Sequence, residues 1–319
     1  MSQPISQLYD RITDFFAAGH LPGQLEQAIQ SGKLSRAIFI DPEPAKARTP
    51  YANLDDKEIK LQATFLSYLW SFCYCMIRFQ QMTIDQIEAP IVRLRNSSEA
   101  PILNVLFDWA NSLRDTYSDW PTDLPTPGQD SQRILEADAL FLFAIRYLMF
   151  HEVGHLILHE SSADFIRREK RNPSLSAEDS RRFRMMELQA DDFAIDTLLA
   201  ANTAEPHRYM NMVGAAIAQL ASLFLLKDDD LRGGRTHPDF DERLKRLAKK
   251  ASFSEQQHTL FFDGTISIGL QVFFERYAVD FLPVDSEAWR LTDFSDLFDM
   301  LYQKIDERKA LYVQHRPFI

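Results

Sequence analysis

The chain has 319 residues, a formal net charge of −11 and a hydrophobic content of 45%. This length accommodates one large domain or two modest ones with a substantial core, and the composition is typical of a globular protein. Because binding to phosphates requires a basic surface, the acidic balance argues against a general nucleic-acid-binding function.

The cysteines and the N-terminus indicate the cellular compartment. Cys73 and Cys75 are the two cysteines of the chain. In a helix they point to different sides, so they are poorly placed to form a disulfide. The first residues read MSQPISQLYDRITDFF and lack the basic region and apolar run of a signal peptide. We therefore expect a reducing, cytoplasmic location.

Residues 1–117 predict an N-terminal region of helices with a small sheet. In chain order, the pattern predicts two short helices within 1–32 divided at Leu21-Pro22-Gly23, a strand at 37–40, a helix over 55–80, a second strand at 91–94 and a helix over 102–115. The strand at 91–94 offers an edge to an extended substrate. Because the strands are few, the predicted class is mainly α, as an α+β fold.

A proline-rich stretch at 118–132 separates this region from the rest of the chain. It reads SDWPTDLPTPGQDSQ, which predicts a surface loop or linker. Residues 133–250 then form the predicted catalytic core and residues 251–319 a C-terminal helical region, unless all parts share one compact domain. In the core we expect a helix through 140–160 that is capped by Asp130 or Ser131 and is followed by a break at Asn172-Pro173. A second helix covers 177–200 and is capped by Ser176 with Asp179. A third helix covers 209–226, and His237-Pro238 opens another.

Two uncharged stretches come near the length of a membrane span. They cover residues 61–77 and 209–226, whereas a spanning helix needs about 20 predominantly apolar residues. Both stretches contain several polar side chains, and the second has an apolar stripe at helical spacing. We therefore interpret both as buried core helices and expect no membrane span.

A metal-binding motif lies in the apolar helix of the predicted core. His151-Glu152-Val153-Gly154-His155 is an HExxH sequence. The two histidines are four residues apart, so they project from the same helical face and can bind one metal ion. Glu152 lies at the neighbouring edge, where its carboxylate can reach a water molecule on that ion. The motif predicts a zinc hydrolase, most simply a metallopeptidase.

A catalytic zinc site needs a third protein ligand. Leu158 and Ser161 occupy the positions where HExxHxxGxxH enzymes have glycine and the third histidine. His159 lies two turns beyond His151, about 12 Å along a straight helix, so we do not expect it to share the ion. We interpret His159 as a residue at the helix end, where a positive charge is favourable.

The better candidate for the third ligand is Glu187, in the sequence Glu187-Leu188-Gln189-Ala190-Asp191. Glu187 and Asp191 are four residues apart on one helical face, and the small Ala190 beside them would let this helix lie close to Gly154. Asp191 can accept the outer N–H of a ligating histidine and so fix its ring. The alternative is that this sequence is only the acidic face of a solvated helix.

These residues resemble the gluzincin metallopeptidases, whose third zinc ligand is the Glu of the second motif. Thr236-His237-Pro238, followed by Arg243, is similar to an element of the HtpX and CAAX-prenyl-protease group, in which the histidine lies beside the zinc. Those relatives carry clear membrane helices, and Asp239 replaces their small residue after proline.

Length and motif order are most similar to the Lit family of phage-exclusion proteins. The resemblance implies a zincin-like catalytic core, a Zn²⁺ cofactor and a protein or peptide substrate. It further implies cleavage of a translation elongation factor during phage infection, triggered by an activating phage peptide. On this basis we expect an antiviral defence function.

Roles for the candidate catalytic residues follow from the chemistry of peptide hydrolysis. Glu152 would act as general base toward water and then protonate the leaving amine. His237 is the candidate donor to the oxyanion, with Arg243 as a further helper. Like Asp191, Arg243 is also expected to lie behind the metal ligands and support them. For His237, a structural role in the turn before proline is the alternative.

Two other functions are compatible with the same motifs. A membrane-associated HtpX-like quality-control protease would require residues 61–77 and 209–226 to span a bilayer. A non-catalytic binding or sensor protein would use the zinc for structure. Structural zinc sites usually close all four positions, often with cysteine, and Cys73 and Cys75 lie far from the motif in sequence.

Overall fold

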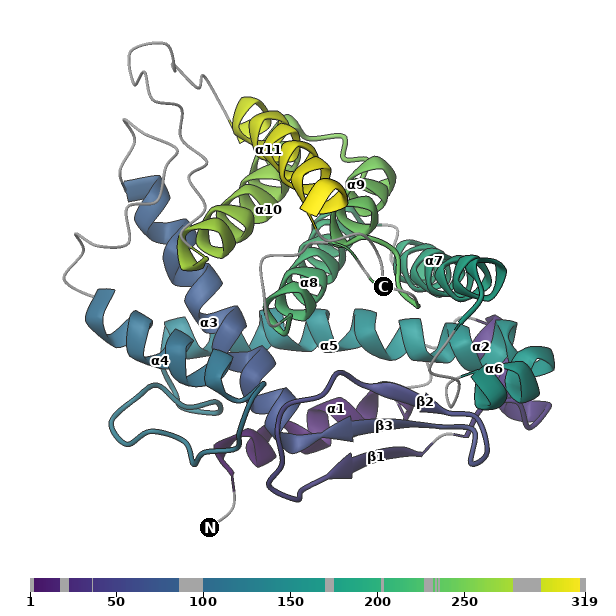
Figure 1. Ribbon diagram of the computed structural model, residues 1–319. Helices are drawn as coiled ribbons and strands as arrows, with labels where there is room; N and C mark the ends of the chain where they lie inside the picture. Colours follow the sequence, from purple (N-terminus) through teal and green to yellow (C-terminus); the bar gives the residue numbers. More distant parts are fainter. Residues whose placement is uncertain are drawn as a thin grey trace.

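The computed structural model describes residues 3–17, 23–35, 37–85, 100–169, 175–201, 204–226, 232, 234, 236–277 and 294–315. Within them the chain is mainly helical with one small three-stranded sheet, which confirms the predicted fold class (Figure 1). The strand predicted at 91–94 and the break predicted at Asn172-Pro173 lie outside the described residues.

The N-terminal region contains the three described strands and three short helices, where the sequence predicts two helices. The helices are η1 (Pro4–Leu8), α1 (Tyr9–Ala17) and α2 (Gly23–Gln30), and the strands are β1 (Ile38–Asp41), β2 (Tyr51–Asn53) and β3 (Glu58–Gln62). In the sheet β3 lies between the other two strands, parallel to β1 and antiparallel to β2. Strand β2 is therefore an edge strand, and it lies next to α5 (Figure 1).

The helix predicted over 55–80 is wrong at its beginning. Residues 58–62 form β3, and the helix α3 spans Ala63–Asp85. Ile59 and Leu61 are buried, whereas Glu58 and Lys60 between them are partly exposed. This alternation has the two-residue period of a strand, but it is short and runs directly into the helical pattern.

Helix α5 (Gln132–Leu158) crosses the middle of the molecule, above the sheet and below α8 in Figure 1. Ser131 is its N-cap, as predicted, and the Ser131 hydroxyl accepts the backbone N–H of Ile134. By length and hydropathy α5 alone among the described helices could cross a membrane, but 72% of its most apolar window is buried inside the protein. A helix at the centre of a protein core has the same properties.

The two uncharged stretches form core helices, as predicted, over residues 63–77 and 209–224. Most side chains of α3 and of α8 (Glu205–Phe224) are buried. Gly214 allows α8 to lie directly on α5, since a Cβ atom there would come within 2.6 Å of the Phe143 backbone carbon. Cys73 and Cys75 are free and buried in α3.

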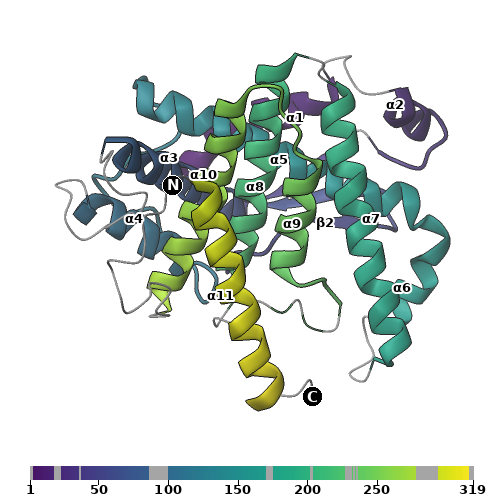
Figure 2. The same ribbon diagram turned by 90° about the horizontal axis from the view of Figure 1, so that it is seen from above.

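Helix α7 (Ala177–Ala201) also packs against α5. It begins at the predicted cap, where the backbone N–H of Asp179 donates to Ser176 Oγ. Seen from above, α7, α9, α8 and α10 run side by side across α5 (Figure 2). The remaining helices are α4 (Ala100–Ser112), η3 (Glu160–Ser162), α6 (Ala163–Glu169), α9 (Phe240–Lys250), α10 (Gln256–Arg276) and α11 (Phe294–His315).

One main core connects these elements from Ile5 in η1 to Ile305 in α11. A second, small cluster joins α6 to the beginning of α7 and consists of Phe165, Ile166, Phe183 and Met186. The helix that we expected to open at His237-Pro238 instead begins at Phe240, with Asp239 at its N-cap. His237 therefore lies in the loop before α9.

Candidate metal centre

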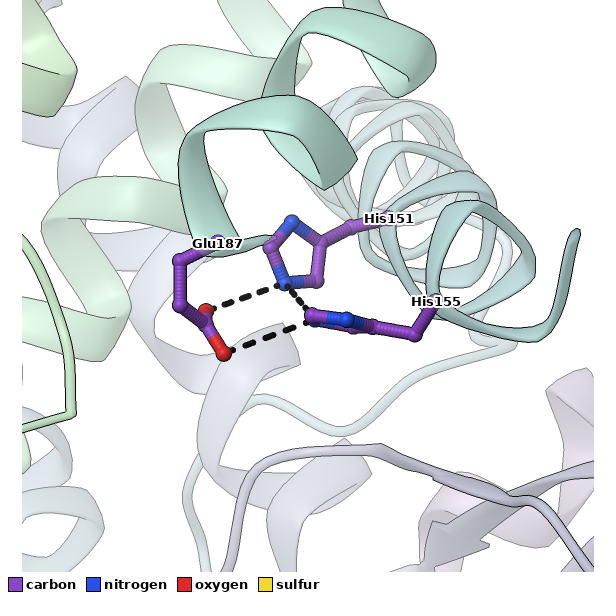
Figure 3. A group of neighbouring side chains, drawn as sticks. All are labelled: His151, His155 and Glu187. Atoms are coloured by element: carbon purple, nitrogen blue, oxygen red, sulfur yellow. Dashed lines mark hydrogen bonds and ion pairs between the residues drawn. The ribbon is translucent and has the colours of Figure 1, made fainter. Parts of the chain in front are cut away.

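His151 and His155 from α5 face Glu187 from α7, as Figure 3 shows. The two Nε2 atoms lie 3.1 Å apart. One Glu187 oxygen lies 3.4 Å from His151 Nε2 and the other 3.5 Å from His155 Nε2. The structure thus brings together the three residues that the sequence proposes as metal ligands.

The close approach of α5 and α7 depends on small residues at their crossing. A Cβ atom on Gly154 would lie 3.1 Å from the Ala190 Cα atom and 3.3 Å from the Phe193 side chain. Gly154 and Ala190 are the small residues that the sequence places at this contact. Because Ala190 lies one turn from Glu187, this approach directs the Glu187 carboxylate to the histidines.

The three donors fit a zinc ion in geometry and in charge. Zinc bound tetrahedrally at about 2.0–2.1 Å separates its ligand atoms by roughly 3.3 Å, close to the distances observed. Burial lowers the pKa of His155 to about 3, so this imidazole is neutral. Although burial opposes ionisation of Glu187, its hydrogen bond to His151 and the nearby histidines hold the pKa of that carboxyl well below its usual range.

Asp191 lies behind His151, on the side away from Glu187. Its Oδ1 atom is 2.8 Å from His151 Nδ1, which is the partnership that the sequence proposes. Arg243 donates from Nε and Nη2 to the two oxygens of Asp191, both at 2.7 Å. Burial disfavours the charge on Asp191, but Arg243 and His151 outweigh it and hold the pKa of the carboxyl well below its usual range.

Two further residues of this network were not predicted. The Tyr147 hydroxyl donates to Asp191 Oδ1 at 2.7 Å, and Gln219 Nε2 donates to the Tyr147 oxygen at 2.8 Å. Tyr147 precedes His151 by one helical turn, so its position on the motif face was a usable signal. Gln219 comes from α8, and the sequence gives no local sign of its contact.

In the absence of a metal ion, this network also sets the charge of His151. Burial alone would lower the pKa of His151, but its hydrogen bonds to Asp191 and Glu187 raise the pKa to about 10. The imidazole therefore carries a proton on both nitrogens at neutral pH. A metal ion that binds at Nε2 must displace one of them.

Glu152 lies beside the three donors and is almost completely buried. Its Oε2 atom accepts the backbone N–H of Ala52 in β2 at 2.6 Å. Glu152 and Ala52 both line the same cavity as His151 and His155. The sequence did not predict Ala52 at the site, because β2 has only three residues and no apolar periodicity.

His237 lies at the rim of the site, where its side chain is half exposed. Its Nε2 atom is 3.8 Å from Glu187 Oε1, and its Nδ1 atom is 2.9 Å from the Thr236 hydroxyl. Arg243, which we considered both as a helper at the oxyanion and as a residue behind the metal ligands, lies against Asp191, which in turn contacts His151. The structure therefore places His237 closer to the reacting side of the site than Arg243.

His159 lies at the end of α5, as predicted, but the expectation of a positive charge on its ring there is wrong. His159 is the C-cap of α5, but its side chain is only 3% exposed. Burial lowers the pKa of His159 and favours the neutral ring. Its Nδ1 atom lies 3.0 Å from His155 Nδ1, so it contacts the ligand without joining the three donors.

A cavity of about 590 Å³ opens above the metal centre between β2, α7 and the loop before α9. One wall is polar and contains the candidate catalytic and ligating residues. The apolar part of the lining, here called the apolar wall, includes Leu54, Leu148, Ile166, Phe183, Met186 and Phe240. The cavity can accept a peptide segment with an apolar side chain next to the polar wall.

Two histidines of an HExxH helix, a glutamate from a second helix and a carboxylate behind the first histidine define a metallopeptidase of the gluzincin kind. The family model for Peptidase U49 matches residues 59–262, which is more than half of the chain. The protein therefore belongs to this family, the Lit peptidases, which are zinc metallopeptidases with an HExxH motif, and it is a peptidase. No curated protein and no solved structure matches the chain.

Family membership confirms the resemblance to the Lit family and the enzyme class. It excludes the non-catalytic sensor function that we considered. The HtpX-like alternative would need residues 61–77 and 209–226 to span a membrane, whereas α3 and α8 are packed inside the protein.

Proposed function

We propose that the protein is a zinc-dependent endopeptidase that cleaves a protein substrate through His151, Glu152, His155 and Glu187. The observation that carries this proposal is the convergence of three metal-binding groups beside the buried carboxylate of Glu152. When bound, zinc would supply a Lewis acid that lowers the pKa of water and polarises a carbonyl group.

The residues of the chain supply the remaining chemistry. Glu152 takes a proton from the attacking water and passes it to the leaving amine. His237 donates from Nε2 to the oxyanion, because a neutral ring that accepts the Thr236 hydroxyl at Nδ1 carries its own hydrogen on Nε2. Asp191 and Arg243 hold His151 in the orientation that directs its Nε2 atom to the metal.

The substrate lies along the edge of β2 in this proposal. Tyr51 and Ala52 line the cavity on one side, and the apolar wall receives a side chain next to the scissile bond. In this proposal, edge strand β2 would offer a substrate-binding edge of the kind that the sequence predicts for residues 91–94.

The biological role that we propose is that implied by the Lit resemblance. The enzyme would act in antiviral defence by cleaving a translation elongation factor after activation by a phage peptide. Support comes from membership in the Lit family. A cytoplasmic location is part of the same proposal and is supported by the two free cysteines.

The test compares the wild type with Glu152→Gln. We expect both to bind one zinc ion, and only the wild type to cleave proteins of a whole-cell lysate, with and without phage lysate added. Mass spectrometry of new N-termini identifies the cleavage sites. Glu160→Gln is the matched control, because Glu160 follows the same helix but is exposed. Cleavage by Glu152→Gln at the wild-type rate would reject Glu152 as the base.

A further inference from the structure

In both candidate ligand histidines, Nδ1 is the outer nitrogen, which faces away from the metal centre. The outer nitrogen of His155 contacts His159, whereas that of His151 contacts the carboxylate of Asp191. His155 Nδ1 lies 3.0 Å from His159 Nδ1, and His159 Nε2 lies 3.1 Å from Gln189 Oε1. Gln189 is on α7, two residues after Glu187. These contacts form a chain from a candidate ligand on α5, through the end of that helix, to the helix that carries the third ligand.

The hydrogens in this chain can be assigned from the direction of each ring. His155 Nε2 faces His151 and Glu187, so its lone pair is directed to the metal centre. A neutral His155 must then carry its hydrogen on Nδ1 and donate it to His159 Nδ1. Because that nitrogen of His159 accepts, its other nitrogen carries a hydrogen, which is donated to the Gln189 amide oxygen.

We propose that His159 and Gln189 are positioning residues that hold His155 in its metal-binding tautomer and ring orientation. This inference rests on the proposed function, since it requires a metal ion at His151, His155 and Glu187. The physical reason is that a ligating histidine is fixed by the partner of its outer N–H. Loss of such a partner typically weakens metal binding by about 10–100-fold.

Two amide substitutions at His159 separate its two hydrogen bonds. The side-chain oxygen of Asn takes approximately the place of Nδ1, so His159→Asn keeps an acceptor for His155. The side-chain nitrogen of Gln takes approximately the place of Nε2, so His159→Gln keeps only the donor to Gln189. We measure the zinc dissociation constant by competition with a chelator. The expected weakening is less than about threefold for His159→Asn and about 10–100-fold for His159→Gln.

Substitutions at the buried His159 could prevent folding, so a second pair of variants changes its exposed partner, Gln189. Gln189 is exposed, so neither Gln189→Leu nor Gln189→Glu should disturb folding. Gln189→Glu keeps an acceptor for His159 and should bind zinc as the wild type does, whereas Gln189→Leu should bind it about tenfold more weakly. His207→Gln, at an exposed position of α8, is the control for a surface change from histidine to glutamine.

The outcomes distinguish this inference from the proposed function. A wild type that binds no zinc would overturn both. If the wild type binds one zinc ion and His159→Gln binds it equally well, the positioning role is rejected while the proposed function stands. Equal weakening by His159→Asn and His159→Gln would also reject it. If His159→Gln does not fold, unequal zinc affinities of the two Gln189 variants support the role and equal affinities reject it.

Discussion

The backbone N–H of Ala52 donates to Oε2 of Glu152 at 2.6 Å, across a hundred positions of the chain. Ala52 is the middle residue of β2, whose only described partner strand is β3. Its N–H therefore points to the free edge of the sheet and into the cavity. The proposed general base is thus held by the strand that we propose as the substrate-binding edge.

Replacing Ala52 by proline removes this hydrogen bond and should reduce kcat about tenfold or more, because an unpositioned general base loses part of a contribution of about 10²–10⁴. Proline is tolerated where an edge-strand N–H does not pair in the ladder. Ala52→Ser keeps the N–H and should retain the wild-type kcat. Kinetics on the substrate identified in lysate provide the measurement, and equal kcat values for both variants would contradict this role for the N–H.

Tyr147→Phe removes the hydroxyl that donates to Asp191 and should weaken zinc binding about tenfold through the orientation of His151. Tyr68→Phe is a matched control, because the Tyr68 hydroxyl is also buried but donates to the Ala221 carbonyl, away from the metal centre. Both variants should lose some thermal stability. If competition with a chelator gives them the same zinc affinity, Tyr147 has no specific effect on the metal centre.

Zinc affinity should rise about tenfold for each pH unit between pH 6 and 8. In this range His155 and Glu187 are already deprotonated, because the pKa of His155 is about 3 and that of Glu187 is below its usual range. His151 has a pKa of about 10, so zinc must displace one proton and binds more tightly as pH rises. Chelator competition at pH 6, 7 and 8 gives the slope, after correction for protonation of the chelator. A flat profile would mean that His151 is neutral before zinc binds.

Gly214→Ala should destabilise the fold by about 2 kcal/mol. A new Cβ atom would lie 2.6 Å from the Phe143 backbone, and overpacking of this kind costs about 3 kcal/mol, more than the gain of about 1 kcal/mol in helix propensity. Gly23→Ala is the control, since no atom lies within 4 Å of its added Cβ. Chemical denaturation measures both variants. Equal stability of Gly214→Ala and the wild type would show that α5 and α8 can separate without cost.

The sequence predicted the parts of the site that depend on helical spacing. His151, Glu152 and His155 share one helix, and Glu187 and Asp191 share another, so each half could be placed from its own pattern. The small residues Gly154 and Ala190 indicated that these two helices lie in close contact.

The parts that were missed depend on contacts between distant segments. Ala52 and Gln219 reach the site from a three-residue strand and from α8, and no local pattern marks such residues. Strand β3 was absorbed into the helical pattern of α3, because five residues of alternation are too few to stand apart. For His159, the predicted position at the helix end is right and the expected positive charge is wrong. Its four-residue spacing from His155 was visible, but distance from His151 alone decided its interpretation.

The metal centre also joins two regions that differ in how extensively they pack into the hydrophobic core. His151 and His155 lie on α5, inside the main core, whereas the beginning of α7 packs on α6 through the small cluster of Phe165, Ile166, Phe183 and Met186. Regions with few core contacts open locally at a lower free energy than the core. A metal ion bound by both regions would cross-link them and raise the free energy of local opening in α6 and early α7. Its removal should therefore speed amide hydrogen exchange in these segments before it affects α5.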